Sequence, residues 1–336
     1  MKFLHITHKT LSVLLLILFT VHIQAQPNKI EESINGIGGE PIAINHLEGQ
    51  IQRIMDSIEM PGLSIAIIND KKIAYHHNFG VGNIETKEAV SPESIFEGAS
   101  LSKPLFAYFV MKMVEEELIE LDTPLYQYLE HPGIDEKSKE DYKLITARMV
   151  LSHQTGFPNH SEGKPISLAF KPGTGFQYSG EGYQYLLAAI GTIKGLGWGE
   201  EFNQFFEKEI NEELGFNQTS FLWNEHFAEN KVYGHKNGKP TNNDTGEWNG
   251  KNFISYASIH SNAKDYAKFI LAMLKRQGLQ PETFNEMLSE QVHFDDDNPL
   301  KIEVGQTGWG LGFAQKKTED GTMHLHTGNN HDFQAY

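Results

Sequence analysis

The apolar positions in the first part of the chain follow a helical pattern and then a strand pattern. Residues 44–60 carry isoleucine and leucine at helical spacing, and Pro61–Gly62 ends that pattern. Residues 63–70 and 72–80 are two short apolar runs on either side of a polar turn. This arrangement predicts a helix followed by an antiparallel hairpin.

Helical patterns dominate the middle of the chain, and strand patterns return near its end. Residues 101–118 predict a long helix, and residues 121–254 contain further helical patterns joined by Gly- and Asn-rich loops. One of these connections, residues 236–252, has few apolar positions and predicts a long surface loop. Residues 261–278 predict another helix, and the segments GWGLGFAQKK and TMHLHTG alternate like paired strands.

This order of elements predicts an α+β fold. We expect a mixed antiparallel sheet built from both chain ends and flanked by helices, with a mainly helical lobe inserted between them. The α/β lobe would comprise residues 43–120 and 255–336, and the helical lobe residues 121–254. A chain of 336 residues can bury a core of this size.

The N-terminus has the pattern of an export signal. Lys2 and Lys9 supply a basic start before an apolar run at 11–21, and a plausible cleavage site ends at Ala25. Residues 1–25 therefore predict a signal peptide, and residues 26–42 a leader before the folded domain. The apolar run is short for a membrane span, although an uncleaved N-terminal anchor is the alternative. We expect a periplasmic or secreted bacterial protein with no stable membrane span after signal cleavage.

Composition and charge exclude several classes of function. The chain has no cysteine, which excludes thiol nucleophiles, disulfides and cysteine-ligated metals. Its formal charge of −16 argues against nucleic acid as a partner. The histidines do not form a recognisable zinc-binding pattern, and the acidic stretch FDDDNPL lacks the glycine and terminal glutamate of a calcium loop. We therefore expect neither a metal nor a cofactor.

The segment EGASLSKPL places Ser100 and Lys103 three residues apart at the start of the predicted 101–118 helix. Residues with this spacing share a helix face, so Lys103 can reach the Ser100 hydroxyl. A partly buried lysine can lose its proton near neutral pH and activate a serine nucleophile. One alternative is a helix-capping Ser100 beside a solvated lysine. Another is the nucleophile elbow of α/β-hydrolases, which needs parallel βαβ units that this pattern lacks.

Several segments, in order, resemble the serine β-lactamase-like family, which comprises class C β-lactamases, DD-peptidases and related esterases. They are PGLSIAIINDKKIAYHHNFGVGNIET, SIFEGASLSKPL, ELDTPLYQYL, ITARMVLSHQTGFP, FQYSGEGYQYLLAAIG, SIHSNAKDYAKFILAML, GWGLGF and HLHTGNN. The resemblance covers most of residues 61–330. It implies a β-lactamase/transpeptidase-like fold.

The resemblance also implies a set of site residues. Ser100 matches the acylated nucleophile, Lys103 the lysine that activates it, and Tyr178 a proton-transferring tyrosine. His326, Thr327 and Gly328 match the family's Lys-Thr-Gly element, which binds substrate. The backbone N–H groups of Ser100 and Asn329 would form the oxyanion hole. Ser152 and His153, in LSHQTGFP, are expected to have a structural role in a turn.

The resemblance has two departures and leaves the substrate open. Gly180 stands where the family's Tyr-x-Asn element has asparagine, which would hydrogen-bond a substrate amide. The chain also stops eight residues after Gly328, so we expect a C-terminally truncated sequence. The predicted function is an exported serine hydrolase that forms an acyl-enzyme with a small-molecule or peptidoglycan-like ester or amide. The alternative is a non-catalytic member of the fold that binds cell-wall fragments.

Overall fold

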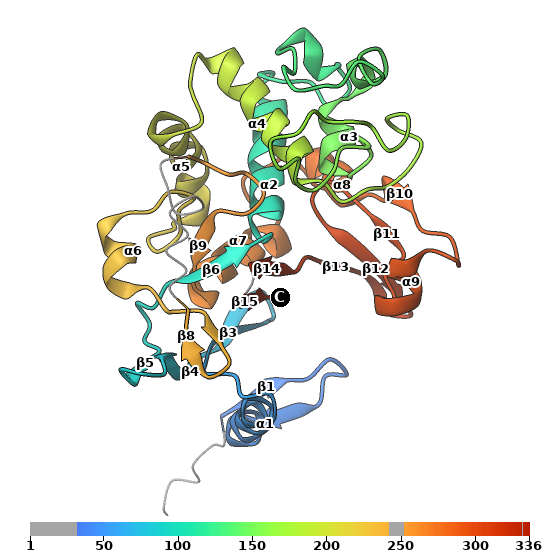
Figure 1. Cartoon of the computed structure of the whole chain (residues 1–336). Coiled ribbons are helices and arrows are strands. Elements are labelled where there is room, and N and C mark those ends of the chain that lie inside the picture. The colour runs from blue at the N-terminus through green and yellow to red at the C-terminus, as the bar shows by residue number, and fades with distance from the viewer. Residues whose placement is uncertain (1–31, 242–251, 331) are drawn as a thin grey trace, which may run out of the picture. The chain divides into compact units, whose positions relative to one another are not determined.

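The computed structural model describes residues 32–241, 252–330 and 332–336 of the chain (Figure 1). The predicted signal peptide and the start of the leader lie outside the described residues, as does most of the predicted 236–252 loop. The chain divides into two compact units, residues 1–47 and residues 48–336. Among the described residues, no helix has the length and apolar character needed to cross a membrane.

The described part of the N-terminal unit is a short hairpin that runs into a helix. Strands β1 (Ser33–Asn35) and β2 (Pro41–Ala43) pair antiparallel within the expected leader. Helix α1 (Ile44–Ser57) follows directly, close to the predicted bounds of 44–60.

The predicted hairpin at the start of the second unit is present. Strands β3 (Gly62–Asn69) and β4 (Lys72–Asn83) pair antiparallel, and a two-residue turn connects them. Both turn residues, Asp70 and Lys71, have positive φ angles of 49° and 56°. A turn of this kind matches the right-handed twist of the two strands. Strand β5 (Glu88–Ala89) adds to the outer edge of β4.

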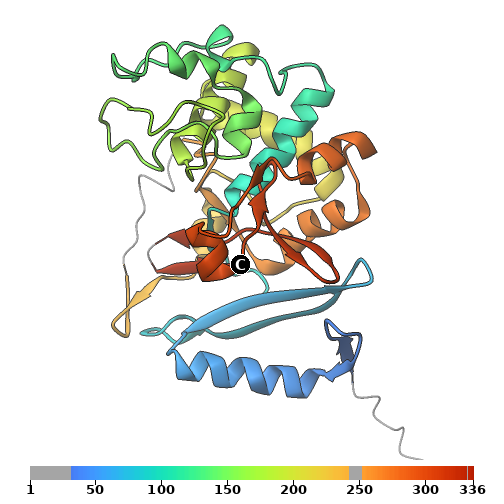
Figure 2. The ribbon, with the colours of Figure 1, turned by 90° about the vertical axis from the view of Figure 1, so that its right-hand side faces the viewer.

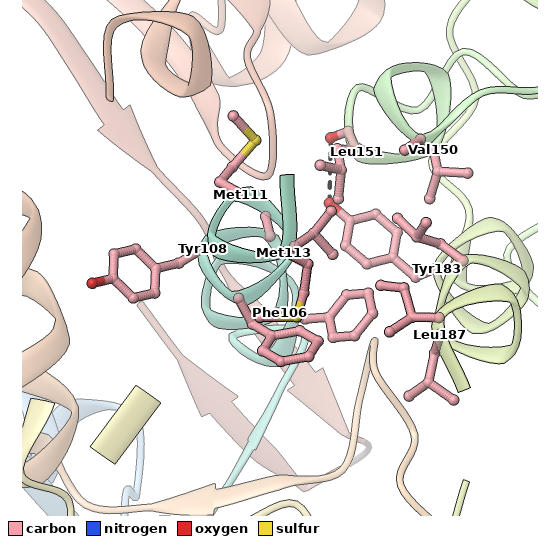
Figure 3. Close-up of a cluster of buried hydrophobic side chains, with 14 of the residues drawn as sticks. Phe106, Tyr108, Met111, Met113, Val150, Leu151, Tyr183 and Leu187 are labelled. Atoms are coloured by element: carbon pink, nitrogen blue, oxygen red, sulfur yellow. Dashed lines mark hydrogen bonds between the residues drawn. The ribbon is translucent and has the colours of Figure 1, made fainter. Parts of the chain in front are cut away.

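Helix α2 (Ser102–Glu115) is the centre of the hydrophobic core. Eleven of its 14 residues are buried, because helices from the middle and the later part of the chain pack around it (Figures 1 and 2). Phe109 contacts three aromatic rings of α5 (Glu200–Leu214). Figure 3 shows Phe106 beside Tyr183 of α4 (Gly180–Lys194), whose hydroxyl donates to the Leu151 carbonyl at 3.3 Å.

The two ends of the second unit meet beside the start of α2. Strand β6 (Phe96–Ala99), which leads into α2, pairs antiparallel with β9 (Ile259–Ser261). Strands β14 (Gly328–Asn330) and β15 (Phe333–Ala335) lie next to β6 (Figure 1). The predicted α+β class is confirmed, with helices in the middle of the chain and strands contributed by both ends.

The remaining elements complete these layers. A four-stranded antiparallel sheet has the order β10-β11-β12-β13. Its strands are β10 (Val292–His293), β11 (Gly308–Trp309), β12 (Ala314–Thr318) and β13 (Gly321–Leu325). The other helices are η1 (Leu125–Gln127), η2 (Asp141–Leu144), α3 (Ala147–Leu151), α6 (Glu225–Asn230), α7 (Ala263–Lys275), α8 (Pro281–Leu288) and α9 (Pro299–Val304). Strands β7 (His235–Lys236) and β8 (Lys239–Pro240) form a small hairpin.

Candidate active site

Ser100 lies in a tight connection between β6 and α2. Ala99, the last residue of β6, has a φ of 49°, a strained value for a residue with a Cβ atom. The Ser102 hydroxyl fixes this turn, because it donates to the Ala99 carbonyl at 2.7 Å and accepts from the Ile259 N–H at 3.0 Å. The N-cap of α2 is Leu101 and has no side-chain cap, so Ser100 does not serve as a helix cap.

Lys103 is completely buried, with its amine beside the Ser100 hydroxyl. Its side chain has 0% exposure, which excludes the alternative of a solvated surface lysine. Lys103 Nζ donates to Ser100 Oγ at 3.1 Å and to the Tyr256 carbonyl at 2.9 Å. Burial lowers the pKa of Lys103 well below its ordinary value of 10.5. A neutral amine in this position can accept the Ser100 proton.

Three tyrosine rings surround the Lys103 amine. Nζ lies 4.5 Å from the ring centre of Tyr178, 5.3 Å from that of Tyr256 and 5.8 Å from that of Tyr183. Ring faces stabilise a nearby cation, so this enclosure tempers the destabilising effect of burial on the protonated lysine.

Tyr178 connects the Ser100 side of the site to His326. It precedes Ser179, whose hydroxyl caps α4 by accepting from the Gly182 N–H at 3.0 Å. The Tyr178 hydroxyl lies 3.5 Å from His326 Nε2, and the Tyr178 ring lies against the Lys103 amine that bonds to Ser100. Burial raises the pKa of Tyr178, so its hydroxyl stays protonated at neutral pH.

His326 and Thr327 lie between β13 and β14, and Gly328 begins β14. His326 Nδ1 lies 2.8 Å from the Thr327 carbonyl, which leaves Nε2 facing the Tyr178 hydroxyl. Burial and the nearby Lys103 amine lower the pKa of His326. A Cβ atom on Gly328 would lie 2.3 Å from the Gly98 carbonyl oxygen. Glycine is therefore required for β14, which also contains Asn329, to approach β6, the strand that leads into Ser100.

Sequence analysis missed two residues that shape the site. Tyr256 supplies the second acceptor for Lys103 through its backbone carbonyl. Any residue at this position could make this contact, so it leaves no signal in the sequence. His153 packs its ring 4.4 Å from that of Tyr178. Its segment, LSHQTGFP, was noted in the sequence, but nothing in the pattern placed it beside Tyr178.

Position 180 explains the absence of the expected asparagine in physical terms. A Cβ atom on Gly180 would lie 2.7 Å and 2.8 Å from two ring carbons of Tyr256, and 2.8 Å from the Asn159 carbonyl oxygen. The Tyr256 ring thus occupies the space that a side chain at position 180 would need.

The described residues do not bring three or more histidine, aspartate or glutamate side chains together as a metal site. The chemistry available at the site is that of a buried amine, two hydroxyl groups and an imidazole. A lysine with a lowered pKa beside a serine, and a tyrosine that packs against this lysine and faces a histidine, could activate the serine and pass on its proton.

Comparison with known proteins gives a consistent picture. The beta-lactamase family model matches residues 47–336. A penicillin-binding protein of Bacillus subtilis (strain 168) is 24% identical over 324 residues, covering 84% of this chain and 66% of the relative. The chain therefore spans slightly less than two thirds of that relative's length.

Solved structures share the fold at low sequence identity. The D-alanine carboxypeptidase AmpC of Burkholderia cenocepacia superposes with a TM-score of 0.68 and 17% identity, covering 87% of this chain and 88% of that one. EstCE1, described as a hydrolase with promiscuous acyltransferase activity, gives a TM-score of 0.67 and 19% identity, covering 82% and 84%. These structures show the fold, and the family match over most of its length shows that the chain belongs to the beta-lactamase family.

Proposed function

We propose that the protein is a serine hydrolase that cleaves an ester or amide through a covalent acyl-enzyme, with Ser100 as the nucleophile. The observation that carries this proposal is the completely buried Lys103 amine, 3.1 Å from Ser100 Oγ. A lysine without exposed surface is rare in protein cores unless it is paired or has a chemical role. Burial lowers the pKa of Lys103, and a lysine must have a lowered pKa to act as a general base near neutral pH.

In the proposed acylation step, Ser100 Oγ attacks the substrate carbonyl carbon while its proton moves to the neutral Lys103 amine. The carbonyl oxygen becomes an oxyanion, which the N–H groups of Ser100 and Asn329 would bind. Tyr178 then donates its proton to the leaving group and recovers one from Lys103. The bond between carbon and leaving group breaks, and the acyl group stays on Ser100 as an ester.

Deacylation would use the same groups in reverse. A water molecule attacks the Ser100 ester and gives its proton to the Tyr178–Lys103 pair, which returns a proton to Ser100 Oγ as the acid leaves. His326 Nε2, 3.5 Å from the Tyr178 hydroxyl, would accept a hydrogen bond that keeps this hydroxyl oriented. Thr327 and Gly328 would line the substrate side of the same segment.

The substrate class is a small-molecule or peptidoglycan-like acyl compound, and the site of action is the periplasm or the cell exterior. One of the structures named above is described as a D-alanine carboxypeptidase and the other as a hydrolase with promiscuous acyltransferase activity, which supports an acyl substrate. The N-terminal pattern of a signal peptide supports export. We further propose the two-lobe division at residues 120 and 255, with the site at their junction.

Turnover of p-nitrophenyl esters by the Ser100→Ala variant tests the proposal. The wild-type protein should hydrolyse the ester and bind a fluorophosphonate probe covalently, and Ser100→Ala should do neither. Ser289→Ala, the same substitution at an exposed serine, is the matched control and should retain both ester hydrolysis and probe labelling. Ester hydrolysis that survives in Ser100→Ala would refute the assignment of the nucleophile.

The alternative of a non-catalytic binding module has one feature in its favour. Gly180 provides no side-chain amide to hold a substrate amide, so recognition of a peptide substrate loses one hydrogen bond. A wild-type protein that binds cell-wall fragments but neither turns over any ester nor reacts with the fluorophosphonate would favour this alternative.

A further inference from the structure

His153 forms hydrogen bonds with Gln177 and Ser179, the residues on both sides of Tyr178. The backbone carbonyl of His153 accepts from the Gln177 N–H at 2.8 Å. Its side-chain Nδ1 accepts from the Ser179 N–H at 3.1 Å. One residue thus fixes the backbone immediately before and immediately after Tyr178, although it lies more than twenty positions earlier in the sequence.

The His153 ring also supports the Tyr178 ring directly. The two ring centres are 4.4 Å apart with an angle of 36° between the planes, and the Trp309 ring contacts both of them, at 5.1 Å from His153 and 5.9 Å from Tyr178. The His153 side chain has 0% exposure, so its ring cannot move aside into solvent. The position of the Tyr178 hydroxyl relative to Ser100 therefore depends on the imidazole.

The conformation and charge of His153 both suit this role. Its φ of 60° is unusual for a residue other than glycine and persists only where surrounding contacts hold it. Burial, followed by the charges of Lys103 and His326, lowers the pKa of His153 well below 6.5. The ring stays neutral, with its proton on Nε2, because Nδ1 accepts the Ser179 bond.

We propose that His153 is a positioning residue for proton transfer by Tyr178. The expectation of a purely structural turn residue does not account for the two bonds that flank Tyr178 or for the ring contact. The role is to hold the Tyr178 hydroxyl in line with the leaving group of the substrate, and it rests on the hydrolase function proposed above.

The test compares two esters of the same acyl group that differ in their leaving groups. A p-nitrophenolate leaves without help, whereas a phenolate or alkoxide needs a proton from Tyr178 in the transition state. His153→Phe keeps a ring of similar size but removes the acceptor for the Ser179 N–H. His153→Asn keeps an acceptor two bonds from Cβ and tolerates positive φ, but removes the ring.

His153→Phe should lower kcat/KM, which reports on acylation, by about 100-fold for the phenyl ester, the loss typical of a misplaced catalytic group, and far less for the p-nitrophenyl ester. Tyr178→Phe should show the same dependence on the leaving group. His153→Asn should recover a large part of the phenyl ester activity. All rates are expressed per active site, counted by titration with a fluorophosphonate, so that misfolded protein does not enter kcat/KM.

The outcomes separate this proposal from the proposed function. Equal losses of kcat/KM on both esters in His153→Phe, with a wild type that hydrolyses both, would overturn the positioning role and leave the hydrolase intact. A wild type inactive on both esters would instead refute the hydrolase function itself.

Discussion

Replacing Lys103 with methionine should remove a pH dependence from the stability of the fold. Lys103 has no exposed surface, and burial lowers its pKa well below 10.5. Methionine is flexible and apolar, has similar length and can fill the same space. The variant therefore removes the titrating amine while it keeps most of the packing around α2.

The sign of the effect follows from the direction of the pKa shift. Because the pKa of Lys103 is lowered in the folded state, the unfolded chain binds more protons at any pH between the lowered value and 10.5. The stability of the wild type should therefore rise with pH across this window, by about 1.4 kcal/mol per pH unit from this one group. The Lys103→Met variant should lose this slope.

Denaturant unfolding between about pH 7 and pH 9.5 measures the slope, because histidines titrate mostly below this range and tyrosines above it. Lys112→Met, a half-buried position on the same helix, is the matched control and should keep the wild-type slope. The unfolding free energy of Lys103→Met minus that of the wild type should therefore fall steadily as the pH rises. If that difference is independent of pH, Lys103 is not held neutral by the fold, and the proposed general base is wrong.

Three further predictions follow from close contacts and buried groups. Gly180→Asn should destabilise the fold by about 1–3 kcal/mol, because its side chain would overpack against Tyr256, and it should also slow the labelling of Ser100. Gly182→Ala, the control, should be tolerated. Denaturant unfolding curves measure the stability, and the kinetics of fluorophosphonate labelling measure the reactivity of Ser100. Gly328→Ala should lower both stability and esterase activity, because its Cβ would clash with the Gly98 carbonyl. Gly197→Ala, whose Cβ would meet open space, should change neither. Unchanged activity in Gly328→Ala would show that β14 does not help form the site. Burial lowers the pKa of His260 to about 4, so the contribution of this residue to stability should be lost as the pH falls from 6.5 towards 4. His260→Gln should reduce the fall of the unfolding free energy in this pH range by up to about 1.4 kcal/mol per pH unit. An unchanged pH dependence in the variant would contradict the lowered pKa.

The elements of the fold were predictable because they depend on local pattern. The hairpin of β3 and β4 follows from two apolar runs and a polar turn, and α2 follows from a continuous apolar pattern. The closeness of Ser100 and Lys103 follows from their spacing of three. By contrast, the pattern could not decide whether Lys103 is buried or solvated, because burial depends on helices that arrive from distant parts of the chain.

The rest of the candidate site depends on long-range geometry. Tyr178 and His326 could be proposed only through the family resemblance, since 148 positions separate them. The Tyr256 carbonyl leaves no signal in the sequence, because backbone atoms are the same at every position. Gly180 reads as a missing asparagine in the sequence, and the Tyr256 ring that takes its space is visible only in three dimensions. His153 reads as a turn residue, because its bonds to Gln177 and Ser179 connect segments that are distant in the chain.

The central claim is that Ser100 carries the acyl group, and peptide mapping of the trapped intermediate tests it most directly. The full chain is mixed with a fluorophosphonate or a slowly deacylating ester, quenched in acid and digested, and the modified residue is identified by mass spectrometry. The account predicts a single adduct on Ser100, with none on Ser102 two residues away, and no adduct in Lys103→Met at neutral pH. An adduct on another residue, or unchanged labelling of Ser100 in Lys103→Met, would contradict it.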